Sequence, residues 1–359
     1  MTSFLKRLVA HLLTNRQSVA VIAFFLLQLG PCAAQANDDL TTLWNRAEEL
    51  FQAGKYREAI PFAEKSVAVT ESASGRESIE TAEALNILGK IYSAAGELKK
   101  AEPAFSRALQ IFEKARGSEH PDVATALNSL GVLSDKTGDY KKSEAYYERA
   151  IAIREKTLGP DDPLTVNALS NLGALYTSQG EFAKAEPLLR RTLAIREKVK
   201  GAEDPDTITS VSNLATLYNQ MGEYAKAEPL YERALQVREK LLGPEHPDTA
   251  TSLNNYATFN RNIGDFTKAE ALFERSLKIL EKTLGPEHPV VSGNLNNLAI
   301  CYKSEGDLAK AEPLYRRALD ISEKANGPEH PATATNLNNL ALLYLEMGDT
   351  DRGIRRRQF

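Results

Sequence analysis

From residue 39 onward, apolar residues recur three and four positions apart, in stretches separated by glycine. The stretch from 289 to 305 shows this spacing at Leu295, Leu298, Ala299 and Tyr302. The next stretch shows it at Leu308, Ala311, Leu314, Tyr315, Ala318 and Ile321. Such spacing puts apolar side chains on one face of an α-helix. The pattern therefore predicts two amphipathic helices, with Gly306 between them and Gly327 ending the second.

The same pair of stretches repeats every 42 residues along almost the whole chain. One glycine column is Gly54, Gly96, Gly138, Gly180, Gly222, Gly264, Gly306 and Gly348. We expect helix pairs at 39–74, 79–116, 121–158, 163–200, 205–242, 247–284 and 289–326, followed by a single first helix at 331–347. No pair can bury its apolar stripes alone, so consecutive pairs must stack. The sequence thus predicts an all-α solenoid at 37–348.

A histidine or aspartate precedes the proline that begins most first helices. These residues are His120, Asp162, Asp204, His246, His288 and His330. Proline suits the first helical position, and the residue before it can act as the N-cap. The histidines also invite a metal interpretation, but each lies in a different repeat, whereas ligands of one zinc ion lie about 2 Å from the metal. We therefore expect helix caps and no metal site.

The repeated residues carry a family resemblance. It rests on Leu295-Asn296-Asn297-Leu298-Ala299, Tyr302, Gly306, Ala311-Glu312-Pro313-Leu314-Tyr315 and Gly327-Pro328-Glu329-His330-Pro331. These motifs resemble the 42-residue tetratricopeptide repeats of the kinesin light chain family, over essentially the whole chain after residue 37. The resemblance implies a right-handed solenoid (a TPR superhelix) whose concave groove binds peptides or protein segments. A kinesin role is not expected, because the chain has a secretion signal in place of the coiled coil that joins such light chains to a motor.

The first 36 residues have the order of a secretory signal peptide. Lys6, Arg7 and Arg16 precede the apolar run 19–29, and Ala34-Gln35-Ala36 forms a small-residue cleavage site. The run is short for a membrane span, which needs about 20 residues. We expect cleavage after Ala36 and a periplasmic or secreted protein without a stable membrane span; an uncleaved N-terminal anchor is the alternative.

Charge and motifs limit the function classes. The net charge is −4, and basic residues outnumber acidic ones at both ends of the chain, so the repeats between them are more acidic than the total. An acidic body argues against nucleic-acid binding. The sequence contains no H-E-x-x-H or G-x-S-x-G motif and no phosphate-binding glycine loop. We expect a non-enzymatic scaffold or adaptor without a cofactor. The alternative is a regulatory or chaperone-like subunit of a cell-envelope enzyme complex.

Asparagines gather on the face of the first helices that should line the groove. We number each first helix so that Leu295 is position 4 and Tyr302 is position 11. Positions 4, 7, 8 and 11 then form the core face, and positions 2, 5, 6, 9, 12 and 13 lie opposite. Positions 5 and 6 hold Asn86, Asn128, Asn171, Asn213, Asn254, Asn255, Asn296, Asn297, Asn338 and Asn339. Their amides could bind a peptide backbone, or could hydrogen bond between neighbouring repeats; both interpretations stay open.

Arg261 and Lys303 occupy position 12 in adjacent repeats, and no acid lies on the groove face of those two repeats. A basic pair inside an acidic body favours a ligand that carries a carboxylate, because arginine can bind one bidentately. Binding of acidic peptides is also what the family resemblance implies. The alternative is that both side chains pair with acids of the second helices.

The chain ends in a short basic segment, 349–359, where a second helix would be due. Leu342, Leu343 and Leu345 lie beside the core residues of the last first helix. Because solenoid ends need a polar outer face, we expect an apolar edge that self-associates, or a chain shortened relative to its relatives.

Overall fold

The structure is a computed structural model that describes residues 31–328 and 330–349, with the backbone alone for residues 31–39. The predicted signal sequence up to residue 30 and the basic segment from residue 350 lie outside the described residues. Helix α3 (Pro31–Gln52) begins before the predicted cleavage site.

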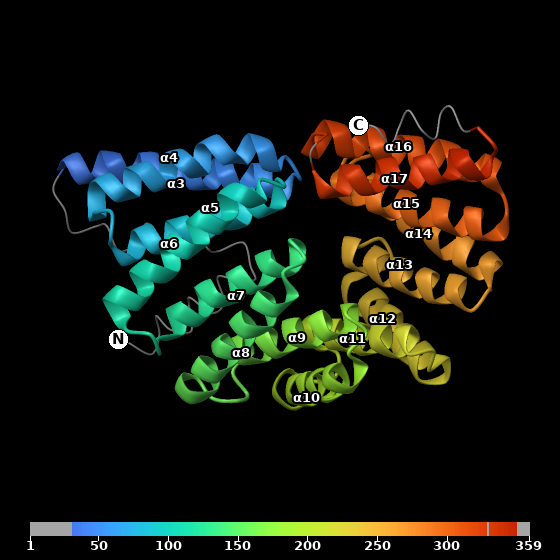
Figure 1. The fold of residues 1–359 in the computed structure, drawn as a ribbon, viewed down its shortest axis with the longest axis horizontal. Coiled ribbons are helices and arrows are strands. Elements are labelled where there is room, and N and C mark those ends of the chain that lie inside the picture. The colour runs from blue at the N-terminus through green and yellow to red at the C-terminus, as the bar shows by residue number, and fades with distance from the viewer. Residues whose placement is uncertain (1–30, 329, 350–359) are drawn as a thin grey trace. The chain divides into compact units, whose positions relative to one another are not determined.

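The predicted helix pairs are present, with bounds within a few residues of the expectation except at the start of α3 (Figure 1). The first helices after α3 are α5 (Ile79–Ala94), α7 (Pro121–Lys136), α9 (Pro163–Ser178), α11 (Pro205–Gln220), α13 (Pro247–Asn262), α15 (Pro289–Glu305) and α17 (Pro331–Glu346). The second helices are α4 (Tyr56–Ser74), α6 (Leu98–Arg116), α8 (Tyr140–Thr157), α10 (Phe182–Lys200), α12 (Tyr224–Leu242), α14 (Phe266–Leu284) and α16 (Leu308–Asn326). The chain is therefore an all-α solenoid.

The helices form two compact units, which divide after Leu175. In the first unit, Leu85, Phe105 and Leu127 are buried in one continuous core that spans several repeats. In the second unit, Phe273 and Tyr315 belong to such a core. The cores run from repeat to repeat, as expected of helix pairs that cannot bury their apolar stripes alone.

The expected caps begin the first helices. The Nδ1 atoms of His120, His246, His288 and His330 accept the backbone N–H two residues later, and the carboxylates of Asp162 and Asp204 do the same. The cap prediction is thus confirmed for all six residues. In the described part of the chain, no group of histidine, cysteine and carboxylate side chains has a geometry that would hold a metal ion.

Glycine at position 8 lets the second helix approach closely in two repeats of the first unit. A Cβ atom added at Gly89 would lie 2.6 Å from the ring of Phe105, and one added at Gly131 would lie 2.7 Å from the ring of Tyr147. Real Cβ atoms do not approach this closely, so alanine at either position forces the aromatic ring or the helix to move.

First helices line the inner side of each unit. They contact one another across repeats, as α5 does with α7, α11 with α13 and α13 with α15. Within each unit, second helices instead pack mainly on their own first helix and on the next one, as α6 does on α5 and α7 and α14 does on α13 and α15. Because elements on the inside of a curved stack lie closest together, the face that carries positions 5, 6, 12 and 13 is the concave face of each unit.

Candidate functional site

Amide hydrogen bonds join neighbouring first helices along the concave face. The Nδ2 atom of Asn171 donates to Oδ1 of Asn128 at 3.1 Å in the first unit. In the second unit, Asn297 donates to Asn254 at 3.1 Å and Asn339 donates to Asn296 at 2.9 Å. In every case the residue at position 6 donates to position 5 of the preceding repeat. We call each such bond a rung.

A second row of rungs joins positions 13 and 12. The Nδ2 atom of Asn262 donates to Oδ1 of Asn219 at 3.4 Å. Lys136 donates to the hydroxyl of Ser93 at 3.2 Å. In the last repeats, the rung is an ion pair of 2.9 Å between Lys303 and Glu346. The concave face is therefore held together by regular contacts between repeats, as one of the two interpretations of the asparagines supposes.

The rungs are interrupted where a serine occupies one of the two facing positions. Ser129 faces Asn86, Ser212 faces Asn255, and Ser304 faces Arg261 in this register. Each of these serine hydroxyls instead donates to the carbonyl four residues earlier in its own helix, at 3.2, 3.1 and 2.8 Å respectively. A serine side chain is short enough to make this local bond, and doing so withdraws it from the neighbouring helix.

The partners of these serines are left with unused hydrogen-bonding groups. Asn255 is half-buried and makes no side-chain hydrogen bond to any described residue. Asn86 is buried, and its Oδ1 atom has no partner within the described residues. A buried polar atom without a partner costs about 1–3 kcal/mol. These two asparagines therefore differ from those that form rungs, although their positions in the repeat are the same.

Arg261 is the charged member of this group. Its Nη2 atom donates to Oδ1 of Asn262 at 3.1 Å, and no carboxylate of the described residues pairs with it. The side chain is half-buried, and this burial lowers the pKa of the guanidinium. Arginine nonetheless stays charged at neutral pH, because its ordinary pKa exceeds 12. A half-buried cation with free N–H groups has a strong affinity for an anion.

Lys303 does not match the expectation of an unpaired basic pair. Its ammonium group pairs with Glu346, which lies at position 13 of the next repeat. The groove-face residues of the two repeats that contain Arg261 and Lys303 include no acid, but Glu346 lies in the repeat that follows them. The acid also comes from a first helix, and not from a second helix as the alternative supposed. Arg261 alone therefore remains without an acidic partner among the described residues.

The structure places the other candidate residues on the same face but with different exposure. Asn213 is half-buried, and Asn338 is exposed at the last first helix. Lys90 of α5 is exposed, yet burial of its surroundings lowers the pKa of its ammonium group. The two observations agree because a side chain on a concave surface can be exposed while protein atoms around it exclude water from its charged group. Glu83 lies at position 2 of the same helix and was not predicted from the sequence as a site residue. It could have been found there, because it is an acid at a groove-face position of α5.

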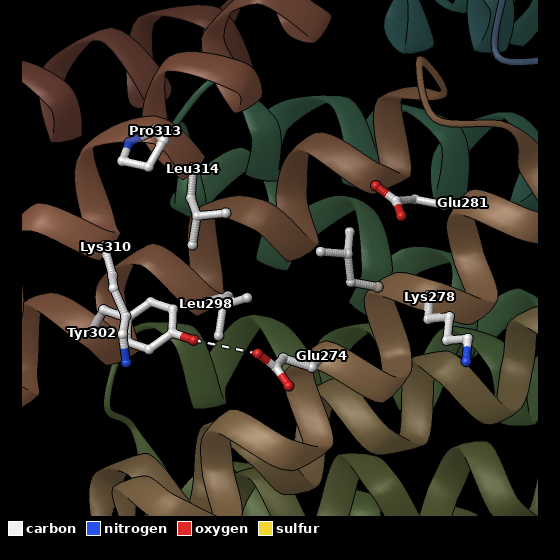
Figure 2. A pocket seen from close by; sticks show the side chains of 9 residues that line it. Glu274, Lys278, Glu281, Leu298, Tyr302, Lys310, Pro313 and Leu314 are labelled. Carbon is white, nitrogen blue, oxygen red and sulfur yellow. Dashed lines mark hydrogen bonds between the residues drawn. The ribbon is translucent and has the colours of Figure 1, made fainter.

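A pocket of about 360 Å³ lies on the other side of the second unit, between α14 and α16 (Figure 2). Leu298 and Leu314 supply apolar walls, and Tyr302 closes one end. The Tyr302 hydroxyl donates to Glu274 at 3.4 Å, as Figure 2 shows, and Lys310 lies over the Tyr302 ring at 4.8 Å. Because these polar groups already contact one another, the pocket offers a ligand fewer unused groups than α13 does.

Comparison with known families identifies the repeat type. A family model described as tetratricopeptide repeat matches residues 38–114, 95–156, 135–198, 206–282, 253–324 and 291–352. A comparison with curated proteins gives no match. In the described part of the chain, every helix is too short or too polar to cross a membrane.

Several solved structures are similar. BtubC (BKLC) from P. vanneervenii is 27% identical with a TM-score of 0.49, over 64% of this chain and 91% of that one. The apo form of RapI is 16% identical with a TM-score of 0.59, over 79% of this chain and 98% of that one. Aspartyl phosphate phosphatase F from Bacillus subtilis is 15% identical with a TM-score of 0.62, over 82% of this chain and 73% of that one. The last two likenesses concern the helical fold.

Proposed function

The chain belongs to the tetratricopeptide repeat family, and we propose that it is a non-enzymatic scaffold or adaptor that binds an acidic protein segment on the concave face of its second unit. The observation that carries this proposal is a pair of groups on α13 that bond to no neighbouring repeat among the described residues: the guanidinium of Arg261, whose one hydrogen bond is to the adjacent Asn262, and the amide of Asn255. Elsewhere on the concave face of the second unit, side chains at the equivalent repeat positions form hydrogen bonds or an ion pair with the neighbouring repeat.

The two groups lie at opposite edges of the concave face of α13. Arg261 lies at the edge toward α15, and Asn255 lies at the edge toward α11, as their places in the rung register require. An extended segment that crosses α13 can therefore contact both. A carboxylate of the segment would accept two N–H groups of Arg261, and the Asn255 amide would bond to the peptide backbone.

Much of the desolvation cost at Arg261 is already present in the unbound protein, because the side chain is half-buried without an acid. Each charged hydrogen bond that the ligand makes would then contribute about 1.5–3 kcal/mol. Lys303 would contribute less, because a ligand must compete with Glu346 for it.

Adjacent repeats supply a matched experiment. A random peptide library displayed against the protein would yield a binding peptide, and its affinity would be measured for Arg261→Ala and for Lys303→Ala. We expect the selected peptides to be rich in acidic residues. Arg261→Ala should weaken binding at least tenfold, and Lys303→Ala should weaken it about twofold or less. Equal effects of the two changes, or peptides without acids, would refute the anchor at Arg261.

The cellular site and partner form a second part of the proposal. The basic, apolar and small-residue order of 1–36 supports export to the cell envelope. The full chain would therefore be used to capture partners from an envelope extract, with the Arg261→Ala variant as the control. Stoichiometric recovery of an enzyme in place of a segment-bearing protein would support the role of a regulatory subunit.

A further inference from the structure

The first unit carries a separate row of side chains on α5, three of which are polar and have no hydrogen-bond or ion-pair partner for their charged or Oδ1 atoms among the described residues. Glu83, Asn86, Ile87 and Lys90 lie three, four and seven residues apart, which places them along one face of the helix. They occupy positions 2, 5, 6 and 9, so this face is concave. We call these four residues the α5 stripe.

Lys90, at the C-terminal end of the stripe, has no acid to pair with among the described residues. The charged group that acts on it is Arg154, which is itself basic and buried. Although the residue is exposed, desolvation by its surroundings and then repulsion from Arg154 disfavour the charged ammonium group. An anion placed beside Lys90 would favour the charged form and offset this repulsion.

Glu83, at the N-terminal end of the stripe, is surrounded mainly by other acids. Its carboxylate lies near Asp122 of α7 and Glu80 of α5, and Arg116 of α6 is the one opposing charge. Arg116 is already paired with Asp122 at 3.0 Å, which is in turn 3.2 Å from Nδ1 of His120. Glu83 is an exposed residue, but its surroundings on the concave face desolvate the carboxyl, and this desolvation together with the two acids raises its pKa to about 7. A cation placed beside Glu83 would offset the repulsion from the two acids.

Between the two charges lie the buried amide of Asn86, whose Oδ1 atom lacks a partner, and the half-buried Ile87. The charged residues are seven apart, so at about 1.5 Å per residue they are separated by about 10 Å along the helix. An extended segment in the polyproline II conformation has three residues per turn and advances about 3.1 Å per residue. Side chains three residues apart on such a segment point the same way and are separated by about 9 Å.

We propose that the α5 stripe is a second docking site, which binds an extended segment carrying one basic and one acidic residue three positions apart. The basic residue of the segment pairs with Glu83 and the acidic residue pairs with Lys90, while the backbone between them lies over Ile87. This site lies in the first unit and uses no residue of α13. One chain could thus hold two different segments.

Three peptides of the same length test the site by charge. Each has a neutral nine-residue sequence of alanine and serine, with Lys and Asp, two Lys, or two Asp placed three residues apart. Isothermal titration at low ionic strength should show that the full chain binds the Lys–Asp peptide at least fivefold more tightly than the other two. Salt at about 1 M, where the screening length is about 3 Å, should remove the preference.

Charge reversal supplies the decisive variant. Lys90→Glu should change the preference to the peptide with two Lys, while the same change at the exposed Lys99 of α6 should leave the preference as it is. Arg261→Ala should also leave it unchanged, which separates this site from the one proposed on α13. Equal binding of all three peptides, no change with Lys90→Glu, or loss of the preference with Arg261→Ala would each overturn the proposal.

Discussion

Asn255 and Asn297 occupy position 6 in adjacent repeats, and the structure gives them opposite roles. Asn297 forms a rung to Asn254 at 3.1 Å, whereas Asn255 faces Ser212 and forms none. Both side chains are half-buried. Replacing each in turn by alanine makes the same chemical change in a similar local setting. Asn297→Ala removes a rung, whereas Asn255→Ala does not.

The expected difference in the free energy of unfolding follows from this match. The change to alanine raises helix propensity by up to about 0.7 kcal/mol at either position, and this contribution cancels in the comparison. A neutral hydrogen bond is worth about 0.5–1.5 kcal/mol net. We therefore expect Asn297→Ala to be less stable than Asn255→Ala by about 1 kcal/mol, and Asn255→Ala to be as stable as the original protein or slightly more so.

Urea unfolding measures this difference. With a slope of about 3 kcal/mol per molar, the midpoints of the two variants should differ by about 0.3 M. Repeat arrays do not always unfold in one step, so hydrogen exchange in α13 and α15 should accompany the midpoints. Binding of a selected acidic peptide should change in the opposite sense, with loss for Asn255→Ala and little change for Asn297→Ala. Equal midpoints and equal affinities would refute the distinction between rungs and interruptions.

Three further predictions concern packing, charge and processing. Gly131→Ala should lower the free energy of unfolding by about 1–3 kcal/mol in urea melts, because its Cβ would meet Tyr147; Gly293→Ala, with open space around it, should raise stability by up to about 1 kcal/mol. The raised pKa of Glu83 means that the folded state holds this proton more tightly than the unfolded state does, so stability should fall as pH rises from about 4.5 to 7. Glu83→Gln should reduce this fall, and an unchanged pH profile would contradict the environment described for that carboxyl. N-terminal sequencing of the envelope form should return Asn37; a chain that starts at Met1 would exclude cleavage.

The helix bounds could be predicted from the sequence because their signals are local. Glycine at the end of a helix and proline after a capping residue act within a few positions, and both recur every 42 residues. The cap at His288, for example, depends on residues two positions apart. The core face followed from helical spacing alone.

The pairing on the concave face could not be predicted in the same way, since each rung joins residues 43 apart. The asparagine columns were visible, but whether an amide meets another amide or a serine depends on the register between helices. Ser304, for example, donates to its own backbone and so leaves Arg261 without a partner in the next repeat among the described residues. Lys303 was misjudged because its acid lies in the following repeat.

One aromatic exchange also required the structure. Asn260 occupies position 11 of α13, where the next first helix, α15, has Tyr302. Tyr256, at position 7, donates its hydroxyl to Glu232 at 2.9 Å and lies beneath Lys268. Tyr302 makes the equivalent contacts from position 11 of α15, donating to Glu274 at 3.4 Å and lying beneath Lys310. The ring has moved by about one helical turn, and its polar contacts are kept.

We propose that interruptions of the rungs leave the groups that bind a partner. Ser304→Glu would remove one interruption, because it gives Arg261 an acid in the register in which Glu346 pairs with Lys303. The measurement is the dissociation constant of a selected acidic peptide for this variant and for the original protein. We expect the Ser304→Glu variant to bind the peptide at least tenfold more weakly than the original protein does, with its helical content and urea midpoint preserved or slightly raised. An unchanged dissociation constant would contradict it.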